Sequence, residues 1–419
     1  MTDEAPAVDS DDTTQRDLRS PRTPWMHSNA ARSQPIDQSF RSEVLVIGAG
    51  ITGALVAQRL ARDGMNVVLV DREDPSQGST MASTAMLLWE IDRSLSELTD
   101  IYGFDSAVRC YRASLYAVSG LIDLVTSNLI NCDLRQRLSL YLSADDSPKR
   151  LSDEFSLRER SGLPGQYLDH SSLLSKFGIA RSAAILSPLV ADADPVRLTN
   201  GILGVARAGG VRLLKGNAVH FESESRMAYV TFENGGEAEG RHVVLATGYV
   251  MPNIVRAEIQ RPASSWAIAT APQPQRLWPE GVMIWEAKQD YNYARTTVGG
   301  RIIFGGEDDL AIIEPDARDA ATLEKSERLT KTLKSLWPAA ETKIDYRWSG
   351  TFDTTDDGLP LIGNVPGFRN IYAAYGYGGN GITFSFLAAE LIARRIAGGT
   401  SSLFDTFAID RISLANVLR

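Results

Sequence analysis

The chain has 419 residues, of which 43% are hydrophobic and 23% charged, as in an ordinary globular protein long enough for two to three structural units. Its formal net charge of −9 argues against a nucleic-acid partner, and the lack of a long apolar run predicts no membrane span. The two cysteines, Cys110 and Cys132, exclude a disulfide framework and show no metal-ligand spacing, so we expect a cytoplasmic protein without a bound metal.

Residues 1–40 are rich in Asp, Ser, Thr, Arg and Pro and follow neither a helical nor a strand period. Such a segment buries too little apolar surface to fold by itself, so we expect a disordered or loosely docked tail. Trp25 and Met26 are exceptions in this polar stretch. We expect the Trp25 ring to be exposed rather than to anchor the tail to the folded body.

The folded body opens with an apolar strand over residues 44–47, a helix that ends near Gly64 and a second apolar strand over residues 67–70. These elements form a βαβ unit, the opening of a parallel sheet. From Ser106 to Ile130, apolar residues recur at alternating intervals of three and four. This spacing predicts one long amphipathic helix that packs against a sheet.

The second half of the chain mixes helical and extended patterns. Helices are predicted over residues 195–210, 323–336 and 382–397, and strands over 211–219, 227–232, 242–246 and 370–375. Residues 282–306 are extended, with a hairpin turn at Gly299–Gly300.

A glycine-rich turn, Gly48-Ala49-Gly50-Ile51-Thr52-Gly53, joins the first strand to the first helix. Gly48 permits a tight turn, Gly50 lets the backbone approach a pyrophosphate, and Gly53 lets the helix pack closely on the strand. The helix N-terminus offers free N–H groups to phosphates, and Asp71, at the end of the next strand, can accept hydrogen bonds from ribose hydroxyls. This context predicts a dinucleotide site rather than a glycine-rich turn without a ligand, and it suits FAD and NAD equally.

Two later segments favour FAD over NAD. A buried strand ends in Ala246-Thr247-Gly248, a small-residue turn typical of flavoproteins whose nucleotide domain is interrupted by other segments. A second glycine cluster, Gly376 to Gly381, lies between a strand and a helix, and no third strand ending in an acidic residue follows. Such a helix N-terminus can lie beside the N1–O2 edge of a flavin and favour the negative charge of its reduced form. The alternative is an ordinary glycine-rich helix start.

Four stretches, in this order, resemble the D-amino-acid oxidase, glycine oxidase and sarcosine oxidase family of FAD-dependent enzymes. They are Val46–Gly53 with Asp71, Gly78–Thr84, Val243–Gly248, and Trp348–Gly363 continuing to Gly376–Thr383. The resemblance implies an α/β chain in a two-domain α+β arrangement: a Rossmann-like FAD-binding domain with a parallel sheet and a substrate domain with a mainly antiparallel sheet. It also implies a discontinuous FAD-binding domain of residues 41–105, 185–265 and 345–419, and a substrate domain of residues 106–184 and 266–344.

The resemblance further implies which residues bind FAD. The loop Ser79–Met86 would pass the pyrophosphate and the flavin, Val219 would contact the adenine, and Gly379–Thr383 would meet the isoalloxazine ring. The residues expected to bind FAD are Gly48, Gly50, Ile51, Thr52, Gly53, Asp71, Arg72, Ser79, Thr80, Ser83, Thr84, Ala85, Met86, Val219, Ala246, Thr247, Gly248, Gly379, Asn380, Gly381, Ile382 and Thr383. No cysteine or histidine stands where family members attach the flavin covalently, so we expect non-covalent FAD.

The segment Tyr291–Thr297 has a period of two, which places Tyr291, Tyr293, Arg295 and Thr297 on one face of a strand. In the resembling enzymes a sheet of the substrate domain roofs the flavin. Tyr293 and Arg295 are therefore the expected catalytic residues, with Arg295 binding a carboxylate through paired hydrogen bonds. The alternative is a solvated face on which Arg295 has a structural role.

One segment departs from the family. Some of its amino-acid oxidases bind the substrate carboxylate with an arginine just after the turn that here reads Trp348-Ser349-Gly350, whereas residues 351–356 contain carboxylates and no arginine. We therefore expect a small amine or amino acid that is oxidised by hydride transfer to the flavin, with dioxygen or another molecule as electron acceptor. The competing interpretations are an NAD-dependent dehydrogenase, a flavin-binding protein without turnover, and a flavin enzyme that reduces or hydroxylates.

Overall fold

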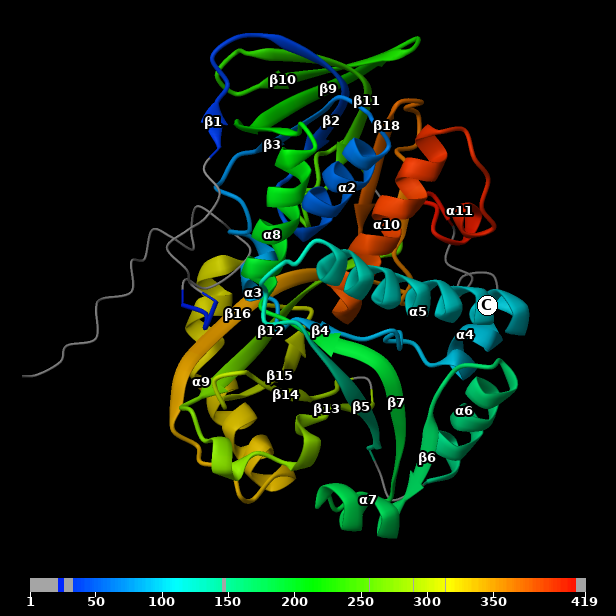
Figure 1. Ribbon diagram of the computed structural model, residues 1–419, viewed down its shortest axis with the longest axis vertical. Coiled ribbons are helices and arrows are strands. Elements are labelled where there is room, and N and C mark those ends of the chain that lie inside the picture. The colour runs from blue at the N-terminus through cyan, green and yellow to red at the C-terminus, as the bar shows by residue number, and fades with distance from the viewer. Residues whose placement is uncertain are drawn as a thin grey trace, which may run out of the picture.

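The computed structural model describes residues 22–25, 33–144, 148–255, 257–288, 290–312 and 314–411. These residues form two nine-stranded sheets, which occupy the upper and lower halves of Figure 1. In the part of the chain so described, no helix is both long and apolar enough to cross a membrane.

The first sheet extends the predicted βαβ opening. Its spatial order is β1 (Gln34–Pro35), β8 (Arg212–Lys215), β3 (Val67–Asp71), β2 (Phe40–Ile47), β11 (Glu237–Leu245), β10 (Met227–Phe232) and β9 (Ala218–Glu224). In addition, β18 (Ile371–Tyr375) pairs with β11, and β17 (Leu361–Asn364) pairs with β18. The strands from β1 to β11 run parallel, as does β18, whereas β9, β10 and β17 pair antiparallel. Residues Val44–Ile47 form an uninterrupted apolar run because β2 lies between β3 and β11 and is covered on both faces.

Helices α2 (Ile51–Arg62), α8 (Pro195–Ala208) and α10 (Gly381–Ile396) lie together over one face of the first sheet (Figure 1). The long helix α5 (Phe104–Ser127) packs against α10, and the buried stripe of α5 includes Val118, Leu121 and Val125. The period of three and four in the sequence therefore produced the expected amphipathic helix.

The second sheet is mainly antiparallel. Its spatial order is β16 (Ile344–Thr355), β12 (Gln260–Thr270), β15 (Ile302–Asp309), β14 (Tyr293–Thr296), β13 (Met283–Ala287), β5 (Arg135–Ser143), β7 (Ala183–Asp192) and β4 (Met86–Leu87), with β6 (Gln166–Asp169) beside β7. Helix α9 (Pro315–Leu336) packs on this sheet through Leu329 and Leu333. The shorter helices and 3₁₀ turns are α3 (Ser79–Ala82), α4 (Leu95–Tyr102), α6 (Lys149–Arg160), α7 (His170–Phe177), α11 (Leu403–Thr406), η1 (Pro274–Arg276), η2 (Pro279–Gly281) and η3 (Gly378–Asn380).

The predicted fold class is confirmed, with two local differences. The strand expected over residues 211–219 is two strands, β8 and β9, broken at Gly216, where a Cβ atom would lie 2.5 Å from Ile36 Cδ1. Helix α9 begins at Pro315 rather than near Leu323, because proline is favoured in the first turn of a helix and the polar residues that follow continue it.

The predicted hairpin around Gly299–Gly300 is formed by β14 and β15.

Sheet membership differs from the expected domain boundaries at several segments, three of which are long. Residues 185–192 belong to β7 and residues 345–355 to β16, so both lie in the second sheet, while α5 packs with the helices of the first sheet. The sequence motif at Trp348–Gly350 predicts that its strand lies near the flavin. It does not predict which of the two sheets contains that strand. We propose the two-domain division with these segments exchanged.

Candidate active site

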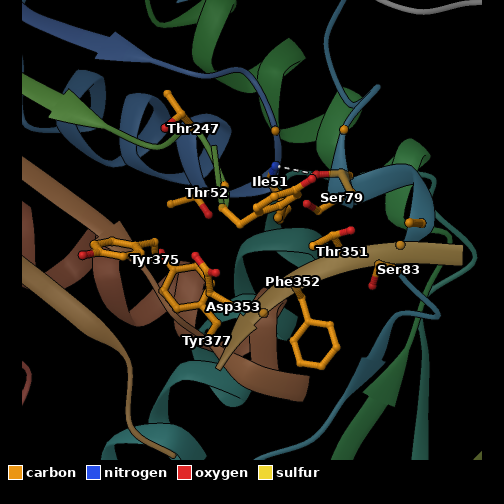
Figure 2. Close-up of a pocket in the computed structure, with 18 of the residues that line it drawn as sticks. Ile51, Thr52, Ser79, Ser83, Thr247, Thr351, Phe352, Asp353, Tyr375 and Tyr377 are labelled. Atoms are coloured by element: carbon orange, nitrogen blue, oxygen red, sulfur yellow. Dashed lines mark hydrogen bonds between the residues drawn. The ribbon is translucent and has the colours of Figure 1, made fainter. Parts of the chain in front are cut away.

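A single cavity of about 720 Å³ is lined by residues of both sheets. Figure 2 shows part of its lining, with Ile51, Thr52 and Thr247 on one side and Phe352 on the other. All but two of the residues expected to bind FAD line this cavity, and the exceptions are Gly53 and Thr383. Of the two expected catalytic residues, Tyr293 lines it and Arg295 does not.

The first glycine turn has the close approaches that its sequence predicts. Gly48 has φ +105°, and a Cβ atom there would lie 2.3 Å from the carbonyl oxygen of Ala246. At Gly53 a Cβ atom would lie 1.7 Å from the Gly48 oxygen, so Gly53 serves the packing of α2 on β2 and faces no ligand space. At Gly50 the nearest atom is Thr80 Oγ1 at 3.1 Å, which leaves Gly50 open to the cavity.

Asp71 ends β3 at the cavity wall. Its Oδ2 accepts a hydrogen bond from Ala49 N at 2.5 Å and its Oδ1 accepts one from Glu73 N at 2.8 Å. Desolvation raises the pKa of the Asp71 carboxyl, although both backbone hydrogen bonds oppose this rise. Because a carboxylate oxygen can accept a second hydrogen bond, Asp71 orders the turn and still has acceptor capacity toward the cavity.

The loop Ser79–Met86 crosses the N-terminus of α2. Thr80 Oγ1 accepts a hydrogen bond from Ile51 N at 3.0 Å, the dashed line in Figure 2. The loop is held from behind by the indole of Trp348, whose Nε1 donates to Ala82 O at 2.9 Å. Trp348, in the motif on β16 that resembles the family, therefore both lines the cavity and positions the loop.

A second indole, that of Trp25, holds the same loop, and the expectation that this ring is exposed was wrong. Trp25 is 6% exposed, and its Nε1 donates to Ser83 O at 2.8 Å. The ring packs with Met81 and Trp348, and the Arg295 guanidinium carbon lies 5.1 Å from its centroid. Met26 lies outside the described residues. Trp25 is buried because its apolar ring and its single N–H both find partners on the loop.

Replacing Trp25 with alanine is expected to weaken FAD binding about tenfold, because the loop Ser79–Met86 loses one of its two indole supports. Fluorescence titration of the FAD-free protein with FAD measures this change. Trp25→Phe keeps the ring without the N–H and should show a smaller loss. An alanine variant that binds FAD as tightly as the unaltered protein would show that the tail has no part in the loop.

The second glycine turn, Gly376 to Gly381, meets the cavity from the other end of the chain. Gly379 N donates to Asp92 Oδ2 at 2.7 Å, and Asn380 Nδ2 donates to Glu90 O at 2.8 Å. Gly378 has φ +56°, and a Cβ atom there would lie 2.2 Å from Asp92 Oδ2. Thr383 does not line the cavity, and its hydroxyl donates to Leu88 O at 2.8 Å.

These observations fit a bound flavin dinucleotide. The open backbone at Gly50 forms a cradle that a side chain would fill, beside the N-terminus of α2. Several buried residues that line the cavity have a polar atom without a hydrogen-bond partner among the described residues, and Asn380 Oδ1 and Asp353 Oδ1 are two of these atoms. Gly48–Thr52, Asp71 and the loop Ser79–Met86 would hold the dinucleotide, and FAD would supply a two-electron acceptor.

The end of the cavity nearest the second sheet is both acidic and aromatic. Tyr291 Oη donates to Asp92 Oδ1 at 3.0 Å, and the Tyr291 ring lies 5.9 Å from Trp285 and 6.1 Å from Tyr293. Asp308 on β15 interacts electrostatically with Asp92 and with both tyrosines. We call this region the acidic chamber, formed by Glu90, Asp92, Trp285, Tyr291, Tyr293 and Asp308.

Tyr293 reaches the chamber because its ring lies over a glycine. A Cβ atom on Gly305, its cross-strand partner, would lie 2.3 Å from Tyr293 Oη. Burial raises the pKa of Tyr293 to about 12, so the phenol is neutral at physiological pH. Tyr293 therefore lines the chamber as a neutral hydroxyl.

Arg295 was expected to face the substrate, but it does not line this cavity. Its Nη2 donates to Ala193 O at 2.8 Å, and its Nη1 lies 3.5 Å from Asp192 Oδ2. Desolvation lowers the pKa of Arg295 to about 10. Residues two positions apart on a strand are separated by about 6.6 Å. Arg295 can therefore share a face with Tyr293 and still lie beyond the end of the cavity. These contacts suit a structural role for Arg295, although the side chain is buried and not on the solvated face that the alternative interpretation assumed.

Asp353 is a buried carboxyl with a single hydrogen bond, from Gln260 Nε2 at 2.7 Å, and desolvation raises its pKa to about 7. In the unfolded chain the pKa is about 3.9, so the folded state binds the proton more tightly and loses stability as pH rises from about 4 to 7. Asp353→Asn is therefore expected to stabilise the FAD-free protein by about 2–4 kcal/mol at pH 8 and by little below about pH 4.

Urea unfolding at the two pH values measures the effect. Asp410→Asn, the same change at an exposed position, is the matched control and should change stability little at either pH. If Asp353→Asn left the stability unchanged or lowered it at pH 8, the buried carboxylate of Asp353 would not destabilise the fold as proposed.

Sequence reasoning missed most of the acidic chamber. Glu90 and Asp92 follow the flavin loop without any period, and Asp308 ends a strand among other acidic residues. The one available indication was the excess of carboxylates in residues 351–356, which included Asp353 but not the chamber itself.

The fold and the cavity define a dinucleotide-dependent oxidoreductase in which two glycine turns from opposite ends of the chain line one cavity. The family described as "FAD dependent oxidoreductase" matches residues 43–395, and the chain belongs to this family.

Three relatives indicate the breadth of the similarity. The chain is 25% identical over 383 residues to gamma-glutamylputrescine oxidoreductase of Escherichia coli strain K12, covering 89% of this chain and 87% of that protein. It is 26% identical over 426 residues to a D-amino acid dehydrogenase of Rhizorhabdus wittichii, covering 88% of this chain and 100% of that protein. The crystal structure of glycine oxidase from Geobacillus kaustophilus superposes with a TM-score of 0.74 at 19% identity, covering 89% of this chain and 99% of that one. The protein is an FAD-dependent oxidoreductase.

Proposed function

We propose that the protein oxidises the carbon–nitrogen bond of a small amine or amino acid, using FAD held without a covalent bond. The observation that carries the proposal is the single cavity, in which both glycine turns and the chamber from the second sheet line one space. A dinucleotide on the glycine turns would therefore have its reactive end beside the chamber. The names of the relatives, which include an amine oxidoreductase and a D-amino acid dehydrogenase, support the same substrate class.

Removal of a hydride from the carbon next to the nitrogen and of a proton from the nitrogen would leave a C=N bond. FAD would supply the acceptor for the hydride, water would take the proton, and dioxygen or another acceptor would then take the two electrons. The chain's own residues bind and orient the amine and exclude water from the chamber. No side-chain base is required for this step, and Tyr293, the remaining expected catalytic residue, contributes a neutral hydroxyl to the chamber wall.

Non-covalent attachment is supported by the positions of the reactive side chains. Cys110 and Cys132 are buried free thiols away from the cavity, and burial raises the pKa of Cys132 to about 11. His220 lies on β9 next to Val219, at the expected adenine end. The free thiols also support a cytoplasmic location, and the net charge of −9 supports the absence of a nucleic-acid partner.

Anaerobic reduction of the FAD-loaded protein tests this function. We expect loss of the visible flavin absorbance on addition of at least one small amine or amino acid, and no loss with NADH or NADPH alone. Bleaching by NADH or NADPH would instead indicate a reductase or hydroxylase. Retained colour with every amine and amino acid would indicate a flavin-binding protein without turnover, and a protein that never binds FAD would favour an NAD-dependent dehydrogenase.

A further inference from the structure

We infer that the substrate is an amine cation without a carboxylate beside the reacting carbon, and that Asp308, with Asp92, binds its ammonium group. This inference rests on the proposed function and narrows it to one of its two substrate classes. It is carried by the charges that line the cavity, by the orientation of Asp308 and by the aromatic walls around it.

Charge is distributed unevenly along the cavity. Among the described residues that line it, the cationic side chains are Arg72, which follows Asp71 at the ribose end, and His220 when protonated. The acidic chamber contributes Glu90, Asp92 and Asp308 and no arginine or lysine. An amino acid needs a cation for its carboxylate, usually a bidentate arginine, and the chamber offers none.

Asp308 is turned into the chamber by an irregularity in β15. The pairing of β15 with β12 shifts register between Ser264 and Trp266, and Glu307 has φ +60°, which together mark a β-bulge. Glu307 and Asp309 both lie within ion-pair distance of Lys325, on the side of the sheet covered by α9. Asp308 lies between them in sequence but lines the cavity, where it interacts with Ser265.

The carboxylates of the chamber are only partly compensated by the described residues. Asp308 Oδ1 and Glu90 Oε2 are buried atoms with no hydrogen-bond partner, and Glu90 is 1% exposed. Glu90 has a distant cation in Arg158, at 3.9 Å, whereas among the described residues no Arg or Lys forms an ion pair with Asp92 or Asp308. Buried carboxylates without a cation are costly, so a bound ammonium would relieve this cost and a bound carboxylate would add to it.

The aromatic walls suit the same ligand. Trp285, Tyr291 and Tyr293 place three neighbouring rings along the chamber, and Trp285 is backed by Tyr141 with ring centroids 4.0 Å apart. The faces of such rings attract alkylammonium groups and accommodate their methylene chains. Phe352, in the segment where the resembling amino-acid oxidases carry an arginine, adds an apolar ring to the cavity lining; in Figure 2 it projects from β16 opposite to Thr351 and Asp353.

The first test compares probes on the FAD-loaded protein. n-Butylamine and putrescine should bleach the flavin anaerobically at least about tenfold faster than glycine, D-alanine or L-proline at equal concentration. Tetramethylammonium, which has no N–H to lose, should perturb the flavin spectrum by binding, and acetate should not. Faster bleaching by the amino acids would overturn the inference while leaving the proposed function intact. If no probe bleached the flavin, the function would fail, and the comparison of tetramethylammonium with acetate would still decide the inference.

The second test removes the charge. Asp308→Asn should raise the KM for n-butylamine and the dissociation constant for tetramethylammonium by about 10- to 100-fold, with a smaller change in kcat, because a hydrogen bond to a charged group is lost from both. Asp309→Asn, the adjacent carboxylate on the opposite face of β15, is the matched control and should change neither value. FAD affinity should stay the same in both variants. Equal effects of the two variants, or none from Asp308→Asn, would overturn the assignment of Asp308.

Discussion

Replacing Gly50 with alanine is expected to reduce FAD affinity by at least about 100-fold, so that the protein is purified nearly colourless. The added methyl group would point into the space between the N-terminus of α2 and Thr80, whose Oγ1 would lie 3.1 Å away. A pyrophosphate held by the N–H groups of α2 needs that space, because the attraction depends on close approach of the backbone. Isothermal titration of the FAD-free protein with FAD measures the loss.

The stability of the FAD-free protein separates this effect from misfolding. Gly50 has φ −73°, which alanine adopts without strain, and the one contact of its Cβ atom is with a hydroxyl at a distance that a small shift relieves. The unfolding midpoint without FAD should therefore change little. Gly204→Ala, in α8 where an added Cβ atom meets nothing within 4 Å, is the control and should keep full FAD affinity. A Gly50→Ala protein that is yellow and binds FAD normally would exclude the turn as the pyrophosphate site.

Replacing Arg411 with alanine is expected to destabilise the protein by about 3–5 kcal/mol, the usual cost of removing one partner from a buried ion pair. Arg411 donates to both carboxylate oxygens of Asp357, at 2.8 and 2.9 Å, and also to Leu359 O and Pro360 O. Tyr102 Oη donates to the same carboxylate at 2.5 Å. The pair therefore joins α4, the Asp357–Pro360 turn and the C-terminal segment, and alanine would leave a buried carboxylate without its cation.

The stabilisation that the Arg411–Asp357 pair provides should decrease as pH falls. Burial by itself would raise the pKa of Asp357, but the hydrogen bonds and charge of Arg411 hold it below its ordinary value. A carboxyl with a lowered pKa stabilises the fold above the unfolded value of about 3.9, and this stabilisation is lost as pH falls through the lower folded value. The difference between the unaltered protein and Arg411→Ala in urea unfolding should thus be large at pH 7 and shrink toward pH 3.

An exposed charge provides the comparison for Arg411. Lys149 pairs with Asp153 one turn along α6, and its side chain is 81% exposed. Lys149→Ala should change stability by less than about 1 kcal/mol. If Arg411→Ala were equally mild, the Asp357 pair would have no special weight in the fold.

The sequence was most informative where one short segment carries the whole mechanism. The turn Gly48–Gly53 and Asp71 have tasks defined by local backbone geometry, so their residue types and spacing are sufficient to predict a dinucleotide site. The amphipathic period of α5 and the apolar runs of β2 and β3 are equally local, and each was found at the expected place. Most of the residues proposed to bind FAD belong to short motifs of this kind, and they line the cavity.

Features assembled from distant segments could not be predicted in this way. Tyr291 and Asp92 are 199 residues apart in the sequence, and Asp308 reaches the chamber through a bulge that no residue pattern marks. The strand period placed Arg295 on the correct face but could not show where the cavity ends. Trp25 was misjudged because a single tryptophan in a polar stretch gives no indication of the loop on which it packs.

A crystal structure of the FAD-loaded protein tests the central claim most directly, namely that both glycine turns bind one flavin beside an acidic chamber. The prediction is pyrophosphate density at Gly48–Gly53 and an isoalloxazine ring between Gly379–Ile382 and the chamber that contains Asp308. Density for a dinucleotide at the first turn with its second ring directed away from Gly379–Ile382, or FAD bound outside this cavity, would contradict the account.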